Sequence, residues 1–209
     1  ESLGCQMKPV EMDAHGMNVR LLEESGADIA YVMPSHQYPM GVVMPVKRRQ
    51  ELLSWAGRGE KRYLIEDDYD SEFRYRGKPV PALQGMDIQG KVIYMGTFSK
   101  SIAPAIRVGY LVLPAPLLAV YKRKCGFYAS TVSRIDQKII YQFLTEGHYE
   151  RHLNRMRAIY KGKHDVLMSE LKTLGTEFIV QGEYAGLHVL LKYRKAGMET
   201  WLVEEAAKA

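Results

Sequence analysis

The stretch KVIYMGTFSKSIAPAIRVGYLVL, residues 91–113, decides the fold. Two apolar runs, Lys91–Met95 and Val108–Leu113, flank a polar turn that carries one lysine. Similar runs stand at Ile29–Met33 and Arg62–Glu66, with a helical pattern between them. Short continuous apolar runs that alternate with helices are typical of strands in an α/β sheet. We therefore predict four strands at these positions, covered by helices on both faces.

From about Pro116 onward the sequence is mostly helical. Helical spacing of apolar residues predicts helices at Lys47–Gly57, Ser133–Glu146, Tyr149–Leu174 and Glu199–Lys208, and short strand-like runs stand at Glu177–Val180 and Leu187–Tyr193. The predicted fold is α/β, with a partly parallel sheet covered by helices. A large domain would span residues 1–146, and a long helix with part of a small α+β subdomain would span residues 147–209.

The composition is that of an ordinary globular protein. The chain has 209 residues, of which 46% are hydrophobic and 25% charged, so a disordered or fibrous chain is excluded. The net charge is +5, but cations and acids are interspersed, which is weak support for a nucleic-acid surface. No apolar run approaches the roughly 18 residues of a membrane span, and no leader opens the sequence. We expect a cytoplasmic protein with no membrane segment. Cys5 and Cys125 have no metal-type spacing.

A cluster of acids, Glu66-Asp67-Asp68-Tyr69-Asp70, follows the predicted strand at Arg62–Glu66. Ligands of open α/β sheets bind in the crevice at the carboxyl ends of the strands. Acids at a strand end also cap helices or face water, which is the ordinary interpretation. A metal site would need further oxygen or histidine ligands that converge there, and we predict none.

The turn Gly96–Lys100 places Thr97, Ser99 and Lys100 at a second strand end, with Arg107 seven residues further on. A single lysine on a turn is normally a solvated surface charge. An amine, hydroxyl groups and a guanidinium together suit a phosphorylated aldehyde cofactor. The amine would form an imine, and the other groups would hold the phosphate. An acid from the upstream cluster would pair with the pyridine nitrogen.

The turn SHQYPMG, residues 35–41, follows a third predicted strand. His36 could serve there as a general base, although one histidine in a loop is more often a hydrogen-bonding turn residue. His36 and Tyr38 could both line a site at this end of the sheet.

Several motifs together resemble a known family. These are, in order, SHQYPMG, IEDDYDSEFRY, PALQGMD, VIYMGTFSKSIAPAIRVGYLV and GHYERHLNRMRAIY. They are similar to the aminotransferase-type domain of MocR (GabR-like) regulators, bacterial transcription factors of the GntR superfamily. These regulators join a winged helix-turn-helix domain to a domain that resembles fold-type I pyridoxal 5'-phosphate (PLP) aminotransferases. The resemblance runs from about Pro9 to the AGLH run at Ala185–His188.

The resemblance implies a role for each matching residue. Lys100 would form the Schiff base with PLP, Asp67 would meet the pyridine nitrogen, and Tyr69 would lie near the phenolic oxygen of the cofactor. Thr97, Ser99 and Arg107 would contact the phosphate, and a guanidinium suits that role best.

Some features depart from the enzymes of the family. Tyr38-Pro39-Met40-Gly41 stands where aminotransferases usually carry Asn-Pro-x-Gly, which favours a regulator over an efficient enzyme. The winged helix and the glycine-rich phosphate segment would precede Glu1, and the arginine that grips a substrate carboxylate would follow Ala209. We therefore expect the sequence to be part of a longer protein, and we do not expect it to bind an operator alone.

The expected function is that of an effector-sensing domain in a PLP-dependent transcriptional regulator. A small amino compound would displace Lys100 from PLP to give an external aldimine and so change the DNA binding of the winged-helix domain. Fold-type I proteins usually form homodimers, so a homodimer is expected by analogy. A catalytic class I/II aminotransferase would share every cofactor residue and is the alternative. An interaction module with a decayed site is a third interpretation. The sequence does not identify the amino compound or the promoter.

Overall fold

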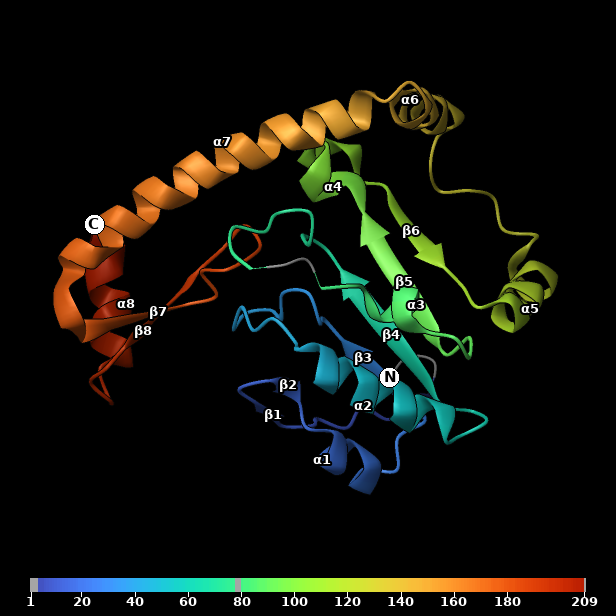
Figure 1. Cartoon of the computed structure of the whole chain (residues 1–209), viewed down its shortest axis with the longest axis horizontal. Coiled ribbons are helices and arrows are strands. Elements are labelled where there is room, and N and C mark those ends of the chain that lie inside the picture. Colours follow the sequence, from blue (N-terminus) through green and yellow to red (C-terminus); the bar gives the residue numbers. More distant parts are fainter. Residues whose placement is uncertain (1–3, 78–79, 209) are drawn as a thin grey trace.

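A four-stranded mixed sheet organises the first part of the chain in the computed structural model, which describes residues 4–77 and 80–208 (Figure 1). The strand order is β3-β4-β5-β6. The strands are β3 Ile29–Val32, β4 Tyr63–Asp68, β5 Val92–Thr97 and β6 Gly109–Val112. The first three are parallel, and β6 runs antiparallel to β5. The predicted α/β class with a partly parallel sheet is confirmed.

The connections explain these directions. The link from β3 to β4 contains α2 (Val46–Gly57), and the link from β4 to β5 contains α3 (Leu83–Met86). The link from β5 to β6 holds only α4 (Phe98–Ser101) and the 3₁₀ helix η1 (Pro104–Ile106). A parallel crossover needs a dozen or more residues, so this shorter link returns the chain antiparallel. The carboxyl ends of β3, β4 and β5 therefore share one edge of the sheet with the start of β6.

The core lies on one face of the sheet. Its buried side chains are Leu22, Ala30, Val32, Met44, Leu52, Trp55, Ala56, Leu64, Leu83 and Val92. On the opposite face Tyr31 is 44% exposed and Leu111 is 55% exposed. The prediction that helices cover both faces is therefore wrong for the described residues. Strand β3 alternates between exposed and buried positions, so its apolar run reflects one buried face and one open face.

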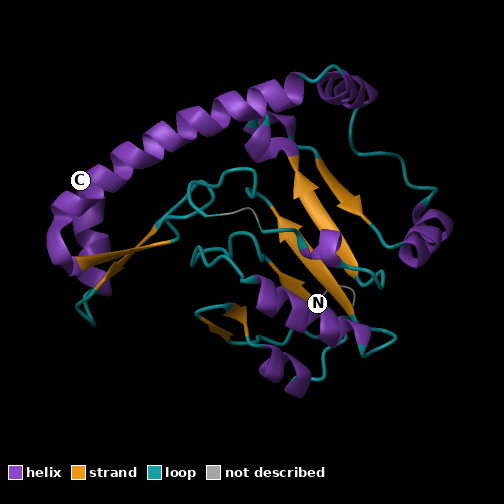
Figure 2. Cartoon of the chain, viewed as in Figure 1, coloured by secondary structure: helices purple, strands orange, loops and turns teal. Residues whose placement is uncertain are grey.

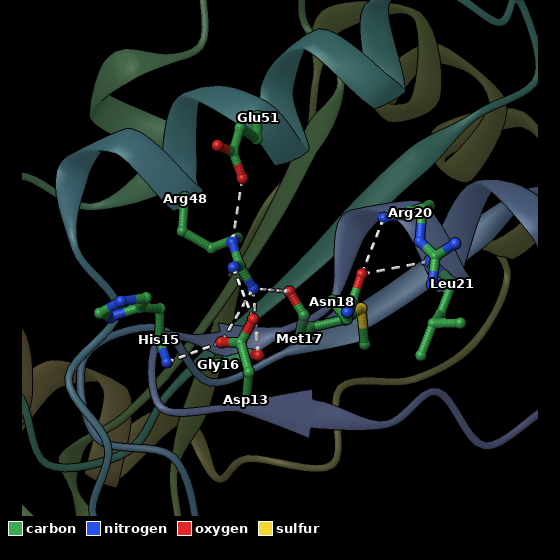
Figure 3. A network of polar contacts seen from close by, with 9 residues as sticks. All are labelled: Asp13, His15, Gly16, Met17, Asn18, Arg20, Leu21, Arg48 and Glu51. Atoms are coloured by element: carbon green, nitrogen blue, oxygen red, sulfur yellow. Dashed lines mark hydrogen bonds and ion pairs between the residues drawn. The ribbon is translucent and has the colours of Figure 1, made fainter.

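Arg48 joins an N-terminal hairpin to α2 (Figure 3). The hairpin pairs β1 (Met12–Asp13) with β2 (Gly16–Met17), and α1 (Val19–Glu24) follows it. The guanidinium donates to the Asp13 carboxylate at 2.8 Å and to the Met17 carbonyl at 2.6 Å, while Nε reaches Glu51 at 3.0 Å. The pKa of Asp13 is lowered because Arg48 donates to its carboxylate.

A second arginine of the same helix, Arg49, is buried. It donates to the carbonyls of Met44, Pro81 and Pro34 at 3.1, 2.9 and 2.8 Å. Its guanidinium lies 3.9 Å from the buried carboxylate of Glu66. Burial raises the pKa of Glu66, and two backbone N–H groups at the start of α3 oppose this. The arginine thus ties α2 to two separate loops.

The second part of the chain is mostly helical (Figure 2). Its elements are α5 Ala115–Cys125, α6 Arg134–Thr145, α7 His148–Leu171, the 3₁₀ helix η2 Lys172–Glu177, β7 Phe178–Gln181, β8 Leu190–Tyr193 and α8 Glu199–Lys208. Helix α7 arches from α6 to the antiparallel β7–β8 pair. Gly147 separates α6 from α7 with a φ of 71°. The division into domains 1–146 and 147–209 stays a prediction.

Two of the predicted elements end or begin several residues inside their predicted bounds. Helix α7 ends at Leu171 because the chain tightens into η2, where Gly175 has a φ of 72°. Strand β8 begins at Leu190 because the preceding backbone bonds elsewhere: the Leu187 N–H donates to Asp70. Across residues 4–77 and 80–208, no helix combines the length and the apolar character needed to cross a membrane.

Candidate functional site

Lys100 lies at the wall of a cavity of about 360 Å³. The turn after β5 carries it within α4, at the edge where the parallel strands end. The other lining residues are Met33, Tyr38, Tyr69, Asp70, Leu187 and His188. The structure therefore brings three of the predicted site residues, Tyr38, Tyr69 and Lys100, to one cavity.

Tyr69 is held by the loop that follows β3. Its hydroxyl donates to the carbonyl of His36 at 2.9 Å and lies 3.3 Å from Nδ1 of the same residue. Burial raises the pKa of Tyr69, and the nearby Asp70 carboxylate adds to the shift. The phenol therefore stays protonated at neutral pH and remains a hydrogen-bond donor.

Alternation along β4 separates the acids of the cluster. Glu66 and Asp68 are buried on the core face, where the Tyr94 hydroxyl donates to Asp68 at 2.8 Å. Asp67 lies on the open face, and the Tyr31 hydroxyl donates to its carboxylate. Burial and this carboxylate both raise the pKa of Tyr31. Asp67 is therefore the acid of β4 that a ligand on the open face can reach, although it does not line the Lys100 cavity.

The predicted phosphate residues lie close to Lys100 in sequence but do not line its cavity. The Thr97 hydroxyl caps α4 by accepting from the Ser99 N–H at 3.1 Å, and it donates to the Val108 carbonyl at 3.3 Å. Both of its hydrogen-bonding functions are thus used locally. Arg107 is the one non-glycine residue with positive φ in the described chain, at 49°. Such a conformation is strained for a side-chain-bearing residue and often marks a functional turn.

His36 does not line the cavity, but it contacts two residues that do, Tyr69 and Asp70. It is 1% exposed, and its Nδ1 lies 3.0 Å from the carboxylate of Asp70, which is 2% exposed. Its Nε2 has no hydrogen-bond partner among the residues described. The geometry matches the interpretation of a hydrogen-bonding turn residue better than that of a general base in contact with a ligand.

His36, Asp70 and His188 also bring potential metal-ligating atoms within 4.8 Å of one another. Nδ1 of His36 is already bonded to Asp70, and Nε2 faces glycine backbone: a Cβ on Gly41 would lie 3.2 Å from it. The pair is closed by its own hydrogen bond, so we treat it as a structural pair and derive no metal chemistry from it.

Sequence reasoning missed Leu187 and His188. Both residues precede β8, although the sequence predicted that the strand would start with them. The only sequence signal for them was the AGLH run. A larger cavity of about 620 Å³ lies beside the core-face residues Asp68 and Tyr94. It contains none of the predicted cofactor residues.

The donor set around Lys100 fits PLP. A primary amine and a protonated phenol share one cavity, and a carboxylate stands on the neighbouring strand. Ser99 precedes Lys100 within α4, and Arg107 ends η1 seven residues after Lys100. Amine, phenol, carboxylate and guanidinium are the groups that a phosphorylated pyridine aldehyde requires.

Comparison with known proteins also relates the chain to PLP-dependent aminotransferases and to regulators that resemble them. The family model described as aminotransferase class I and II matches residues 4–208. The chain is 40% identical over 201 residues to YdeL, an uncharacterized HTH-type transcriptional regulator of Bacillus subtilis, covering 96% of this chain and 43% of YdeL. It is 33% identical over 196 residues to MocR of Rhizobium meliloti, a probable rhizopine catabolism regulatory protein, covering 93% of this chain and 40% of MocR.

A solved structure shows the same fold. The kynurenine aminotransferase of Pyrococcus horikoshii superposes with a TM-score of 0.80 at 26% identity, covering 95% of this chain and 52% of that one. The chain thus spans less than half the length of the two regulators and about half of this enzyme.

Proposed function

The chain belongs to the aminotransferase class I and II family, in the branch of MocR-type regulators, and we propose that it is the effector-sensing domain of a PLP-dependent transcriptional regulator. The observation that carries the proposal is the position of Lys100, at the wall of a cavity that it shares with Tyr38 and Tyr69. The regulator relatives support a role in transcription.

The residues divide the work of holding the cofactor. When bound to Lys100, PLP would supply an electrophilic carbon at which only a primary amine can replace the lysine. The Tyr69 hydroxyl stays protonated and lines the cavity; its one hydrogen is donated to the His36 carbonyl, so it would have to leave that carbonyl to donate to an oxygen of the bound group. Asp67 can accept from a protonated pyridine nitrogen through the carboxylate oxygen that Tyr31 leaves free. Arg107 and Ser99 would hold the phosphate, since a guanidinium offers two parallel donors.

The cavity can transmit the arrival of an amine because its walls come from distant parts of the chain. Tyr38 and Lys100 precede α7, whereas Leu187 and His188 follow it. A ligand in contact with both parts can favour one relative arrangement over another. Shifting such an equilibrium from 1:99 to 99:1 requires about 5.5 kcal/mol of differential binding.

The assembly and location are part of the proposal. We expect a homodimer by analogy with fold-type I proteins, and β6, α5 and α6 each carry exposed apolar side chains, among them Leu111, Tyr121 and Ile135. We expect DNA contact through a winged-helix domain of the parent protein, as in HTH-type relatives, and hence a cytoplasmic location.

A catalytic aminotransferase is the second candidate. The similarity to the Pyrococcus enzyme favours it, since the fold over this region is shared. Tyr38 occupies the position of the usual asparagine and favours the regulator. The regulator relatives also have the higher identity of the two groups.

Borohydride trapping tests the proposal. We expect PLP to be reduced onto Lys100 and located there by peptide mass mapping. Lys100→Ala abolishes the adduct, and Lys124→Ala on the exposed helix α5 leaves it unchanged. An adduct that persists in Lys100→Ala would assign the cofactor to another lysine. Assays of the loaded protein with amino donors and keto-acid acceptors separate the two candidates: rapid transamination would favour the enzyme.

A further inference from the structure

We propose that His188 contacts the side chain of the bound amine and helps to select it, and that the buried His36–Asp70 pair positions His188. The inference rests on the proposed function and names a specificity-determining residue for it.

His188 is fixed beside the cavity by three contacts. Its ring lies 4.4 Å from the ring of His36, centroid to centroid, and 5.4 Å edge-on from that of Tyr38. Its Nε2 lies 3.2 Å from the carbonyl of Pro39. A carbonyl can only accept, so Nε2 carries the hydrogen and Nδ1 of the neutral ring keeps its lone pair. His188 lines the cavity, where Nδ1 of a neutral ring can serve as a hydrogen-bond acceptor for a ligand.

Asp70 connects the segment that carries Leu187 and His188 to the end of β4. One carboxylate oxygen accepts from His36 Nδ1 at 3.0 Å and from the Leu187 N–H at 3.1 Å, so the residue next to His188 is tied to the end of β4. Both members of the pair are almost fully buried. Loss of the carboxylate charge would weaken both bonds and let His188 move.

Glycine backbone closes this arrangement. A Cβ on Gly186 would lie 1.9 Å from His36 Nδ1 and 2.5 Å from Asp70 Oδ2. A Cβ on Gly41 would lie 2.2 Å from the Cα of Gly182. The segment before β8 therefore approaches His36 as closely as a backbone can, which leaves little freedom for the ring of His188.

The chemistry favours amines whose side chain carries a hydrogen-bond donor. Such a donor can use the acceptor on His188, whereas an apolar side chain such as that of leucine would leave it unpaired. Selectivity from one hydrogen bond amounts to roughly three- to tenfold in affinity.

Reduced adducts of PLP and amino acids provide the test, because they bind without a covalent bond to Lys100. Affinities of phosphopyridoxyl-L-glutamine, phosphopyridoxyl-L-leucine and pyridoxamine phosphate are measured by calorimetry on the whole chain. His188→Phe keeps a ring and removes the acceptor. We expect it to lower the glutamine-to-leucine affinity ratio about three- to tenfold, with pyridoxamine phosphate unaffected. His15→Phe, at an exposed site in the N-terminal hairpin, is the matched control and leaves the ratio unchanged.

Asp70→Asn tests the positioning role, and His36→Gln replaces it if circular dichroism shows that the first variant fails to fold. Either variant lowers the same ratio. An unchanged ratio in His188→Phe, with pyridoxamine phosphate still bound, overturns the selectivity while the proposed function stands. A ratio that falls in His188→Phe but not in the positioning variants overturns the role of the pair. Failure of the wild-type chain to bind any of the three ligands overturns the proposed function and the inference together.

Discussion

Replacing Gly186 by alanine tests how tightly the cavity wall is packed. Gly186 has a φ of 76°, and a Cβ there would lie 1.9 Å from His36 Nδ1. An L-residue in the left-handed region costs about 1–2 kcal/mol. Forcing an extra carbon into a packed interior costs a further ~1–3 kcal/mol. Gly186→Ala should therefore lower the free energy of unfolding by about 2–5 kcal/mol.

Gly197→Ala is the matched control. Gly197 has a φ of 74°, and a Cβ there would meet no atom within 4 Å. This variant keeps the backbone cost and removes the collision. Both variants lose the same glycine entropy in the unfolded chain, so that contribution cancels between them.

Urea unfolding gives the comparison. Trp55 is fully buried, so its fluorescence reports on loss of the core. We expect Gly186→Ala to be less stable than Gly197→Ala by ~1–3 kcal/mol. Equal destabilisation of the two variants would refute the reasoning, since it would mean that the segment does not press against His36.

Three further predictions concern two cofactor residues and one half-buried acid, Glu72. Arg107→Ala should weaken PLP affinity at least about tenfold, as expected for loss of a bidentate phosphate contact, without moving the absorbance maximum at saturation; a moved maximum with unchanged affinity would contradict the phosphate role. Asp67→Ala should shift the cofactor absorbance band, whereas Asp68→Ala should not, because Asp68 is buried on the core face; the reverse result would exchange their roles. Burial raises the pKa of Glu72 above its ordinary value of 4.5, so the folded chain binds that proton more tightly and loses stability as the pH rises from there. Glu72→Gln should flatten this fall as the pH rises above about 4.5, and an unchanged slope in urea unfolding would contradict it.

The strands were the most predictable part of the molecule. Their apolar runs match the observed sheet strands to within two residues at each end. In β4 and β5 the backbone ladder continues through Asp67 and Thr97 beyond the apolar residues, whereas in β3 and β6 it stops before the apolar run ends. Backbone pairing does not depend on the hydropathy of a side chain, so the pattern could not place these ends.

The two faces of the sheet were less predictable. An apolar run indicates a strand, but it does not show whether a helix covers each side. In β3 the exposed Ile29 and Tyr31 are as apolar as the buried Ala30 and Val32. Only the directions of the crossover helices decide which set is buried.

The candidate site was predictable where its chemistry is local. Tyr69 follows β4 directly and Lys100 comes three residues after β5, so their shared edge could be inferred. The bond between Tyr31 and Asp67, the burial of His36 and the arrival of His188 depend on residues far apart in sequence. No local pattern contains that information.

The long-range closure of the cavity has a consequence for biosynthesis. Asp70 bonds to a residue 117 positions later, and the Pro39 carbonyl meets a histidine 149 positions later. His188 leaves the ribosome 88 residues after Lys100. At ~5–20 residues per second this delay lasts about 4–18 s. During that interval Lys100 is already part of the nascent chain, but the cavity that it lines lacks Leu187 and His188. A ligand that needs the assembled cavity can therefore bind only after His188 has been synthesised and has folded against the Pro39 carbonyl.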